Sequence, residues 1–247
     1  MIRYKITIEY KGTRYYGWQI QPGLPTVQEE IEKAIFAFSH YKAEVYGSGR
    51  TDKGVHATGQ VAHFDLPKEY DTHKLVRSIN HFLQEEDIVV LDCEKVESDF
   101  HARYSAIRRT YQYRIINRSS PSAIYKNLSW VRHLPLDPEK MQEGANVLIG
   151  HHDFTSFRAT MCQAKSPIIT VDNIRIISEN YPEIIIEVSA RSFLHHMVRN
   201  IVGTLRKVGE GELTPKDVQN ILDAKNRAAA EMTAPADGLF LCKVDYS

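Results

Sequence analysis

The segment Gly59-Gln-Val-Ala-His-Phe-Asp-Leu66 decides the fold. It is the predicted strand that joins the first β-α-β group of elements to a second helix and strand. The other predicted elements are a strand over residues 2–10, a helix after Thr26, a strand ending near Tyr46, a helix over about 71–83 and a strand over about 87–97. This β-α-β-β-α-β order is that of the ferredoxin-like motif, whose antiparallel sheet carries helices on one face.

The first predicted helix has both a start signal and an apolar face. Thr26 is expected to be the N-cap, and Glu29 three residues later completes a capping-box pattern. Apolar residues then recur at helical spacing, namely Val27, Ile31, Ala34, Ile35 and Phe38. The preceding residues, 11–25, are rich in Gly, Tyr and Pro and are expected to form a loop.

The second half of the chain repeats the mixture of strands and helices. Strands are predicted at 108–117, 127–132, 169–178, 183–190 and 239–245, and helices at 137–149, 193–208 and 214–224. No sequence repeat relates the halves, so their similarity is inferred from element order alone. We expect an α+β protein of two ferredoxin-like domains, residues 1–105 and 106–247.

Composition places the chain among ordinary globular proteins. It has 247 residues, of which 43% are hydrophobic and 25% charged. No apolar run is long enough for a transmembrane helix, and the N-terminus lacks the core of a signal peptide, so we expect a cytoplasmic protein. Three widely separated cysteines argue against a disulfide framework and a zinc site.

The charge pattern is compatible with a nucleic-acid partner only locally. The net charge is zero, whereas nucleic-acid-binding domains are often basic. Residues 85–99 hold seven acids and one base, but residues 101–118 hold five arginines and no acid. A local basic face, not the sum, decides phosphate binding.

The first segment that could carry chemistry is Gly47-Ser-Gly-Arg-Thr-Asp-Lys-Gly-Val-His-Ala57. Its glycines permit a tight turn and the close approach of another chain, and they bracket Asp52. No Gly-Lys-Ser/Thr follows at the required spacing, which excludes a P-loop. The alternative is an ordinary turn with a solvated aspartate.

The second segment is Ser192-Phe-Leu-His-His-Met-Val-Arg-Asn-Ile-Val-Gly-Thr-Leu205. As a helix it has a wide apolar surface and a narrow stripe with Ser192, His196, Arg199, Gly203 and Arg206. Arg199 on such a helix needs a carboxylate or phosphate partner, because an isolated buried charge is too costly. A structural ion pair is the alternative. Metal binding by His195 and His196 is disfavoured, since adjacent helix residues point apart.

Two further segments are aromatic. In Arg108-Arg-Thr-Tyr-Gln-Tyr-Arg-Ile115, a strand would place Arg109, Tyr111, Tyr113 and Ile115 on one face, which suits stacking on an unpaired base. A half-buried strand with a solvated charged face is the alternative. The segment Tyr15-Tyr-Gly-Trp-Gln-Ile-Gln-Pro22 is either a binding loop or a packed turn.

Taken together, the motifs resemble the bacterial tRNA pseudouridine synthase family that modifies uridines 38–40 of the anticodon stem-loop. The resemblance covers nearly the whole chain, and its most specific part is the Gly47–Ala57 segment. The other matching motifs are Gly17-Trp-Gln-Ile-Gln21, Thr26-Val-Gln28, Phe100-His-Ala-Arg103, Tyr111-x-Tyr113, Gly150-x-His-Asp-Phe-Thr-Ser-Phe157, Phe193-Leu-x-His-Met-Val-Arg-Asn-Ile-Val-Gly203 and Thr233-Ala-Pro-Ala-Asp-Gly-Leu-Phe-Leu241.

The resemblance implies a homodimer of two-domain subunits whose sheets join across a catalytic cleft, with tRNA as partner and no metal or organic cofactor. Asp52 matches the essential catalytic aspartate. Arg50 and Arg199 match basic residues of the cleft, Arg199 as partner of the aspartate, and Tyr111 matches the tyrosine that contacts the target base. Further substrate contacts are expected from Lys53, His56, Gln19 and Arg109.

Two other functions remain open on the residues alone. An RNA-binding module or tRNA-folding chaperone would need no catalysis, and a metal-dependent hydrolase would use Asp52, His56 and His63. For a synthase, the sequence leaves open whether Asp52 attacks C1′ or C6 of the nucleotide or promotes a glycal.

Overall fold

The computed structural model describes residues 1–246 and shows an α+β protein, which confirms the predicted fold class. The chain divides into two compact units. Unit 1 comprises Met1–Ile107 and Phe240–Ser247, and unit 2 comprises Arg108–Leu239. This division differs from the expected one in its last strand, which is grouped with the first unit. No helix in the described part of the chain is both long and apolar enough to cross a membrane.

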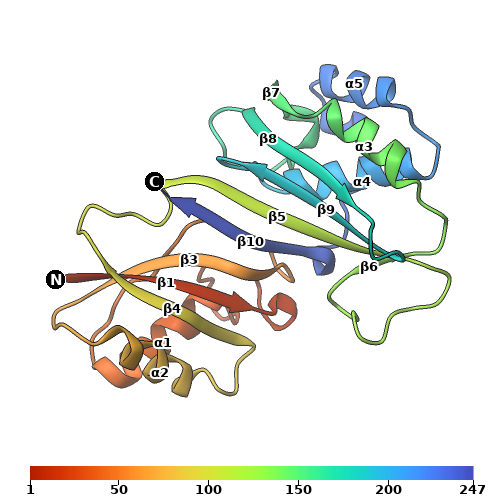
Figure 1. The fold of residues 1–247 in the computed structure, drawn as a ribbon. Helices are drawn as coiled ribbons and strands as arrows, with labels where there is room; N and C mark the ends of the chain where they lie inside the picture. The colour runs from red at the N-terminus through yellow and green to blue at the C-terminus, as the bar shows by residue number, and fades with distance from the viewer. Residues whose placement is uncertain (247) are drawn as a thin grey trace. The chain divides into compact units, whose positions relative to one another are not determined.

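Unit 1 has the predicted β-α-β-β-α-β order, with the last strand of the chain added. Its elements are β1 (Ile2–Tyr10), α1 (Val27–Ser39), β2 (Tyr46–Gly47), β3 (His56–Leu66), α2 (Thr72–Phe82), β4 (Ile88–Val96) and β10 (Leu239–Tyr246), with a 3-10 turn η1 (Gly12–Arg14) after β1. The strands run in the order β4-β1-β3-β10, and β2 pairs with β3. Both β3 and β4 are antiparallel to β1, whereas β10 runs parallel to β3. Helices α1 and α2 lie on the same side of this sheet (Figure 1).

The core of unit 1 follows from the alternation of its strands. Every second residue of β1 and of the end of β3 is fully buried, as are the apolar residues of one side of each helix. These residues are Tyr4, Ile6, Ile8, Ala62, Phe64, Leu66, Ile31, Ile35, Leu75 and Ile79. The apolar face predicted for the first helix is thus its buried face, apart from Phe38 at its end, which is half-buried.

The capping box predicted at the start of α1 is wrong. Thr26 makes no side-chain cap bond, and its buried Oγ1 has no hydrogen-bond partner among the described residues. The first free amides of the helix are instead satisfied by the preceding loop: Val27 and Gln28 donate to the carbonyls of Gly17 and Trp18 at 3.2 and 3.0 Å. A backbone partner from the loop has taken the role that the sequence assigned to a side chain.

Unit 2 consists of four antiparallel strands, one short strand that pairs in parallel, and three helices. Its elements are β5 (Ala106–Asn117), β6 (Trp130–Arg132), α3 (Pro138–Asn146), β7 (Gly150–Asp153), η2 (Thr155–Phe157), β8 (Ile168–Ile177), β9 (Glu183–Ala190), α4 (Met197–Gly209), α5 (Pro215–Asp223), η3 (Arg227–Ala229) and η4 (Ala236–Gly238). The strand order is β5-β9-β8-β7, and β6 pairs with the end of β5. The sequence did not predict β7, a four-residue strand of the polar sequence Gly-His-His-Asp.

Helix α4 begins four residues later than predicted. His196 adopts the left-handed conformation at φ 61°, which a right-handed helix cannot include. The chain before it is tethered elsewhere, because Ala159 donates to the carbonyl of His195 at 2.8 Å. Ser192 and His196 are therefore not on the helical stripe. His195 and His196 also do not point apart as predicted, because their ring centroids lie 4.0 Å from each other.

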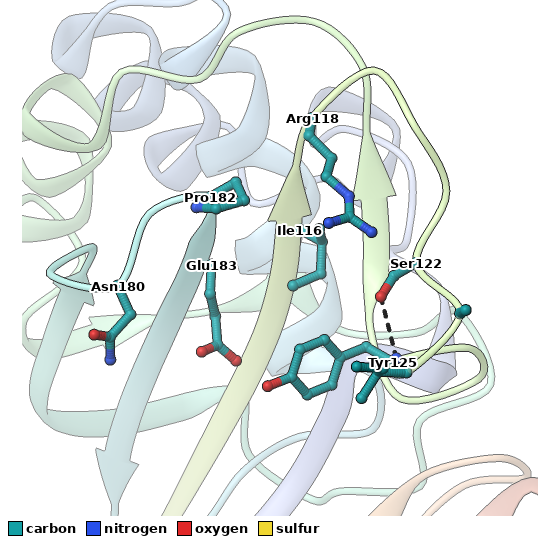
Figure 2. Close-up of a pocket in the computed structure, with 9 residues that line it drawn as sticks. Ile116, Arg118, Ser122, Tyr125, Asn180, Pro182 and Glu183 are labelled. Carbon is teal, nitrogen blue, oxygen red and sulfur yellow. Dashed lines mark hydrogen bonds between the residues drawn. The ribbon is translucent and has the colours of Figure 1, made fainter.

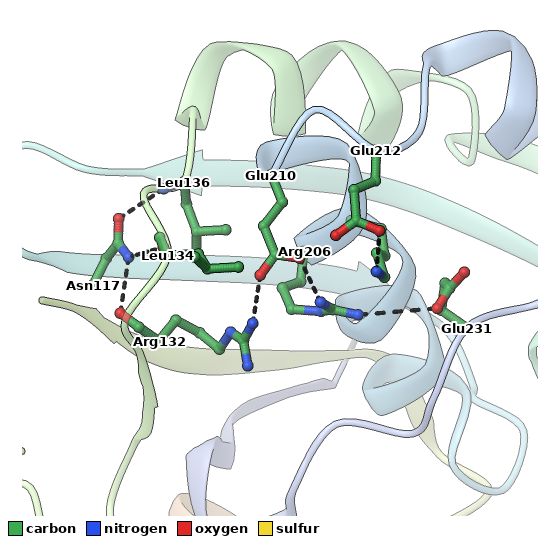
Figure 3. Close-up of polar contacts among 9 residues, drawn as sticks. Asn117, Arg132, Leu134, Leu136, Arg206, Glu210, Glu212 and Glu231 are labelled. Carbon is green, nitrogen blue, oxygen red and sulfur yellow. Dashed lines mark hydrogen bonds and ion pairs between the residues drawn. The ribbon is translucent and has the colours of Figure 1, made fainter. Parts of the chain in front are cut away.

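The polar stripe of α4 is paired, as its burial requires. Arg206, only 6% exposed, contacts Glu210 at 2.5 Å and Glu231 at 3.9 Å. Glu210 also binds Arg132 at 2.5 Å, so that one carboxylate serves two guanidinium groups (Figure 3). Asn117 fixes the segment after β6 by bonding the carbonyls of Arg132 and Leu134. This buried network ties β6 to the end of α4.

Candidate functional site

The loop that carries Asp52, residues 48–55, joins β2 to β3 in unit 1 and is fixed to β3 at its first residues. The amide of Ser48 donates to the carbonyl of Val61 at 2.7 Å, and its hydroxyl donates to Gln60 Oε1 at 2.7 Å. The Gln60 amide nitrogen in turn donates to the carbonyl of Gly49 at 2.9 Å. A buried glutamine thus holds the start of the loop from one side.

A second loop holds the residues next to Asp52. Trp18 donates its amide to the carbonyl of Thr51 at 3.1 Å, and the Thr51 hydroxyl bonds Tyr10 Oη at 2.8 Å. Gly17 has φ +95°, and a Cβ there would lie 2.5 Å from the Thr51 carbonyl oxygen. Only glycine permits this approach. The loop is therefore clamped at Thr51, and the half-buried Asp52 follows it immediately.

The aromatic segment 15–22, left open between a binding loop and a packed turn, packs against the Asp52 loop. A Cβ at Gly47 would lie 2.6 Å from the Trp18 ring, so the indole rests on the end of β2. Lys53 Nζ lies 3.8 Å from the centre of the Tyr16 ring, a cation–π contact between the two loops. Gln19 and Arg50 are exposed.

His56 is placed differently from the expectation of a substrate contact. It is 1% exposed, its Nδ1 accepts the amide of Gly12 at 2.9 Å, and its ring stacks on Phe240 with centroids 4.7 Å apart. His63 is also buried, and its Nδ1 accepts the amide of Ala102 at 3.2 Å. Both histidines that a metal-dependent hydrolase would use with Asp52 are thus committed to packing and to backbone donors.

In unit 2, β5 presents the face predicted from its alternation. Arg109, Tyr111, Tyr113 and Ile115 are all buried, between 0 and 8% exposed. The Tyr111 ring meets Phe193 edge to face with centroids 5.1 Å apart, and Arg109 Nη1 donates to the carbonyl of Arg191 at 2.5 Å. Burial raises the pKa of the neighbouring Tyr113 phenol, whose hydroxyl donates to the carbonyl of Pro235 at 2.8 Å.

Arg199 lies in the first turn of α4 and is held by the segment before β10. Its Nε donates to the carbonyl of Ala234 at 2.7 Å, and the Ala234 amide donates back to the Arg199 carbonyl at 3.1 Å. The carboxylate or phosphate partner expected for Arg199 stays a prediction, and the carbonyl of Ala234 is a partner that the sequence did not predict. Nor did the sequence indicate the supports of the Asp52 loop, Gln60 and Tyr10; only the glycine-aromatic pattern of Gly17-Trp18 pointed there.

One pocket of unit 2 contains none of the predicted site residues. It has a volume of about 580 Å³ and is lined by Ile116, Arg118, Ser122, Ala123, Ile124, Tyr125, Asn180, Pro182 and Glu183. Figure 2 shows Tyr125 on one wall and Glu183 facing it. Arg114 contacts both residues: it forms an ion pair with Glu183 at 2.6 Å, and its guanidinium lies 4.9 Å from the centre of the Tyr125 ring. This pocket therefore lies at the C-terminal end of β5.

Comparison with known proteins assigns the chain to a family. Residues 6–105 and 145–247 match the family described as tRNA pseudouridine synthase, and these ranges contain the Asp52 loop and α4. The chain belongs to the tRNA pseudouridine synthase family. A synthase of this kind is an isomerase that acts on tRNA.

Full-length relatives support the same conclusion. The chain is 51% identical over 247 residues to the tRNA pseudouridine synthase A of Ehrlichia ruminantium strain Gardel, covering 100% of both chains. The protein of the same name from strain Welgevonden is also 51% identical over 247 residues, again covering 100% of both. Among solved structures, a Cbf5-Nop10-Gar1 complex matches with TM-score 0.37 and 10% identity, covering 96% of this synthase and 57% of that chain, too weak a likeness to add to the family match.

Proposed function

We propose that this synthase converts uridines 38, 39 and 40 of the tRNA anticodon stem-loop to pseudouridine, with Asp52 as the catalytic nucleophile. The observation that carries the proposal is the construction of the Asp52 loop. Gln60 fixes its start, and Trp18 and Tyr10 clamp Thr51, so that a half-buried carboxylate is presented on a rigid turn. Such preorganisation is what a reaction at one sugar or ring carbon requires.

The reaction breaks the C1′–N1 bond of uridine and forms a C1′–C5 bond, while the C5 proton leaves and N1 gains a proton. A stem uridine must first leave the base stack, which costs roughly a few kcal/mol. Exposed cations such as Arg50 and Lys53 would offset this by contacting phosphates. Tyr111 would then stack on or hydrogen-bond the flipped ring, and Arg199 would act as the partner of the aspartate.

The remaining parts of the proposal follow from the family resemblance. The enzyme is proposed to act as a homodimer in the cytoplasm, with tRNA as its partner and without a metal or organic cofactor. Of the predicted substrate contacts, Gln19 and Lys53 are exposed, whereas His56 is buried and Arg109 is bonded to a backbone carbonyl. The proposal therefore gives direct contact to Gln19 and Lys53 and a supporting role to His56 and Arg109.

The test is Asp52→Asn, measured by tritium release from tRNA labelled at C5 of uridine. We expect the rate to fall by about four orders of magnitude or more, as for other nucleophile deletions, while the dissociation constant for tRNA and the circular dichroism spectrum are kept. Asp92→Asn, the same change at an exposed residue of unit 1, should leave the rate unaltered. Normal turnover by Asp52→Asn would overturn the assignment of the nucleophile.

The positions of the modified uridines are tested separately, by carbodiimide primer extension on tRNA from cells with and without the protein. Pseudouridine at positions 38, 39 and 40 should disappear without it. Loss at other positions only would overturn the proposed target but not the synthase activity. If wild-type protein binds tRNA and releases no tritium, the RNA-binding or chaperone alternative holds.

A further inference from the structure

Three matched motifs meet at α4, and most of their residues have no role in the proposed chemistry. They are the segment ending at Phe157, the residues Asn200 and Gly203 of the helix, and the segment beginning at Thr233. We propose that Asn200, Gly203 and Thr233 are positioning residues. They hold the segment 231–235 against α4, so that the Ala234 carbonyl sets the direction of the Arg199 guanidinium. The inference deepens the proposed function and rests on its assignment of Arg199 to the chemistry.

Asn200 is the point at which the three segments join. It is fully buried, with 0% exposure. Its amide nitrogen donates to the carbonyl of Phe157 at 2.7 Å, and its Oδ1 accepts from the Thr233 hydroxyl at 2.7 Å and from Arg227 Nη2 at 3.2 Å. A buried amide with three hydrogen-bond partners couples their positions, and loss of the Thr233 hydroxyl removes the shorter of the two bonds to Oδ1.

Gly203 brings the backbone of the segment into direct contact with the helix. A Cβ at this position would lie 1.9 Å from the carbonyl oxygen of Met232, which no relaxation of side chains could relieve. One turn further on, Arg206 faces Glu231 at 3.9 Å (Figure 3). Arg199, Gly203 and Arg206 have the i, i+4, i+7 spacing of one helix face, so the segment runs along a single stripe of α4.

The segment 231–235 makes its last contact with α4 at Arg199. Ala234 and Arg199 exchange two hydrogen bonds, of 2.7 Å from Nε and 3.1 Å to the Arg199 carbonyl. From the other side, the Tyr113 hydroxyl holds the next carbonyl, that of Pro235, at 2.8 Å. A guanidinium is planar, so a bond at Nε fixes the directions in which its terminal nitrogens donate. Displacing the segment would therefore turn these nitrogens away.

The kinetic test is Thr233→Val, which removes the hydroxyl and keeps the shape. We expect the single-turnover rate of pseudouridine formation to fall about 10- to 100-fold, since small misplacements have effects of this size. The dissociation constant for tRNA should stay within about twofold, because no phosphate contact is removed. Thr233→Ser should restore the rate. Thr170→Val is the matched control: it removes a hydroxyl bonded to His151 at 2.8 Å on the exposed side of β8 and should change nothing.

A double-mutant cycle separates positioning from general destabilisation. If Thr233 acts through Arg199, Thr233→Val should reduce the rate of an Arg199→Lys variant much less than that of the wild type. Equal reductions in both backgrounds would overturn the inference, as would a wild-type rate for Thr233→Val. Wild-type activity of Arg199→Lys would instead contradict the proposed role of Arg199 in the reaction.

A measurement on the free protein tests the hydrogen bond between Arg199 Nε and the Ala234 carbonyl independently of activity. The Nε–H resonance of Arg199, assigned by its loss in Arg199→Lys, should exchange slowly with solvent in the wild type. In Thr233→Val and in Gly203→Ala it should exchange at the rate of an exposed arginine. Slow exchange in Thr233→Val would overturn the inference even if Gly203→Ala fails to fold. If the wild type makes no pseudouridine, the proposed function is wrong. The exchange result would still show whether Thr233 holds the hydrogen bond between Arg199 Nε and the Ala234 carbonyl.

Discussion

At the scale of single residues, Gly17 combines a positive φ with close contact to the Asp52 loop. Two glycines of the same loop have positive φ, Gly17 at +95° and Gly23 at +75°, but only Gly17 faces backbone of the Asp52 loop. Gly23→Ala should cost about 1 kcal/mol for its conformation alone. Gly17→Ala should cost about 2–3 kcal/mol and lower the rate of pseudouridine formation, because the loop must move. Urea unfolding and tritium release measure both; equal effects of the two variants would contradict the clamp.

His63 gives the stability of unit 1 a dependence on pH. Burial first, and then the neighbouring His101 and Arg3, lower its pKa from 6.5 to about 4, whereas Asp65 opposes the shift. Between these values the unfolded chain binds a proton that the folded protein does not, so the free energy of unfolding falls as pH falls from 6.5 to 4. Above pH 6.5 His63 is neutral in both states, and the free energy of unfolding is not reduced by its protonation.

The matched variants for this prediction are His63→Asn and His73→Asn. Asparagine keeps an acceptor for the Ala102 amide but does not titrate. Urea unfolding between pH 4 and 7 should show a shallower slope for His63→Asn, while His73→Asn, at an exposed site of α2, should match the wild type. A slope that His63→Asn leaves unaltered would assign the pH dependence to other groups, such as His101.

The sequence predicts properties of a residue that depend on its neighbours along the chain, such as which face of a strand is buried. It does not predict burial that depends on residues distant in sequence. The glycine-rich segment pointed to Asp52, and the alternation of β5 gave the buried face that holds Tyr111. The burial of His56 was missed because the ring that covers it, Phe240, belongs to the other end of the chain. Such a contact depends on tertiary structure and leaves no trace in the neighbouring residues.

At the scale of elements, the two threonines that precede helices give opposite predictions. Thr214 forms a capping box with Asp217 at the start of α5, whereas Thr26 at the start of α1 is buried and its Oγ1 is unpaired among the described residues. Thr214→Val should cost about 1 kcal/mol. Thr26→Val should be neutral or stabilising by up to about 1 kcal/mol, because it removes a polar atom that has no partner. Urea unfolding compares them, and a larger loss for Thr26→Val would show a hidden role of its hydroxyl.

Most elements could be predicted because their periodicity is local; the errors are at element ends and in one missed strand. The strands β1 and β9 have the predicted bounds, and β5 begins two residues earlier. The start of α4 was wrong because apolar residues continue before Met197, while the backbone turns left-handed at His196. The strand β7 was missed because its side chains carry no strand pattern and its pairing with β8 defines it.

At the scale of the whole molecule, the sequence predicted two α+β halves but not the path of the last strand. Unit 1 draws on both ends of the chain, and a Cβ at Gly59 of β3 would lie 2.2 Å from the carbonyl oxygen of Cys242 in β10. The Tyr246 hydroxyl also donates to the carbonyl of Ala102 at 2.7 Å. Local patterns cannot choose between sheets for such a strand, because its alternation would suit either.

This connectivity makes the stability of the N-terminal sheet depend on the end of the chain. Leu241 in β10 is 0% exposed, whereas Lys243 is exposed. Leu241→Ala should cost about 2–5 kcal/mol, and amide exchange should become faster in β1 and β3, although these strands are distant in sequence. Lys243→Ala should leave both quantities within about 0.5 kcal/mol of the wild type. If the β1 and β3 amides of Leu241→Ala keep their wild-type protection, the last strand is not part of the cooperative core of unit 1.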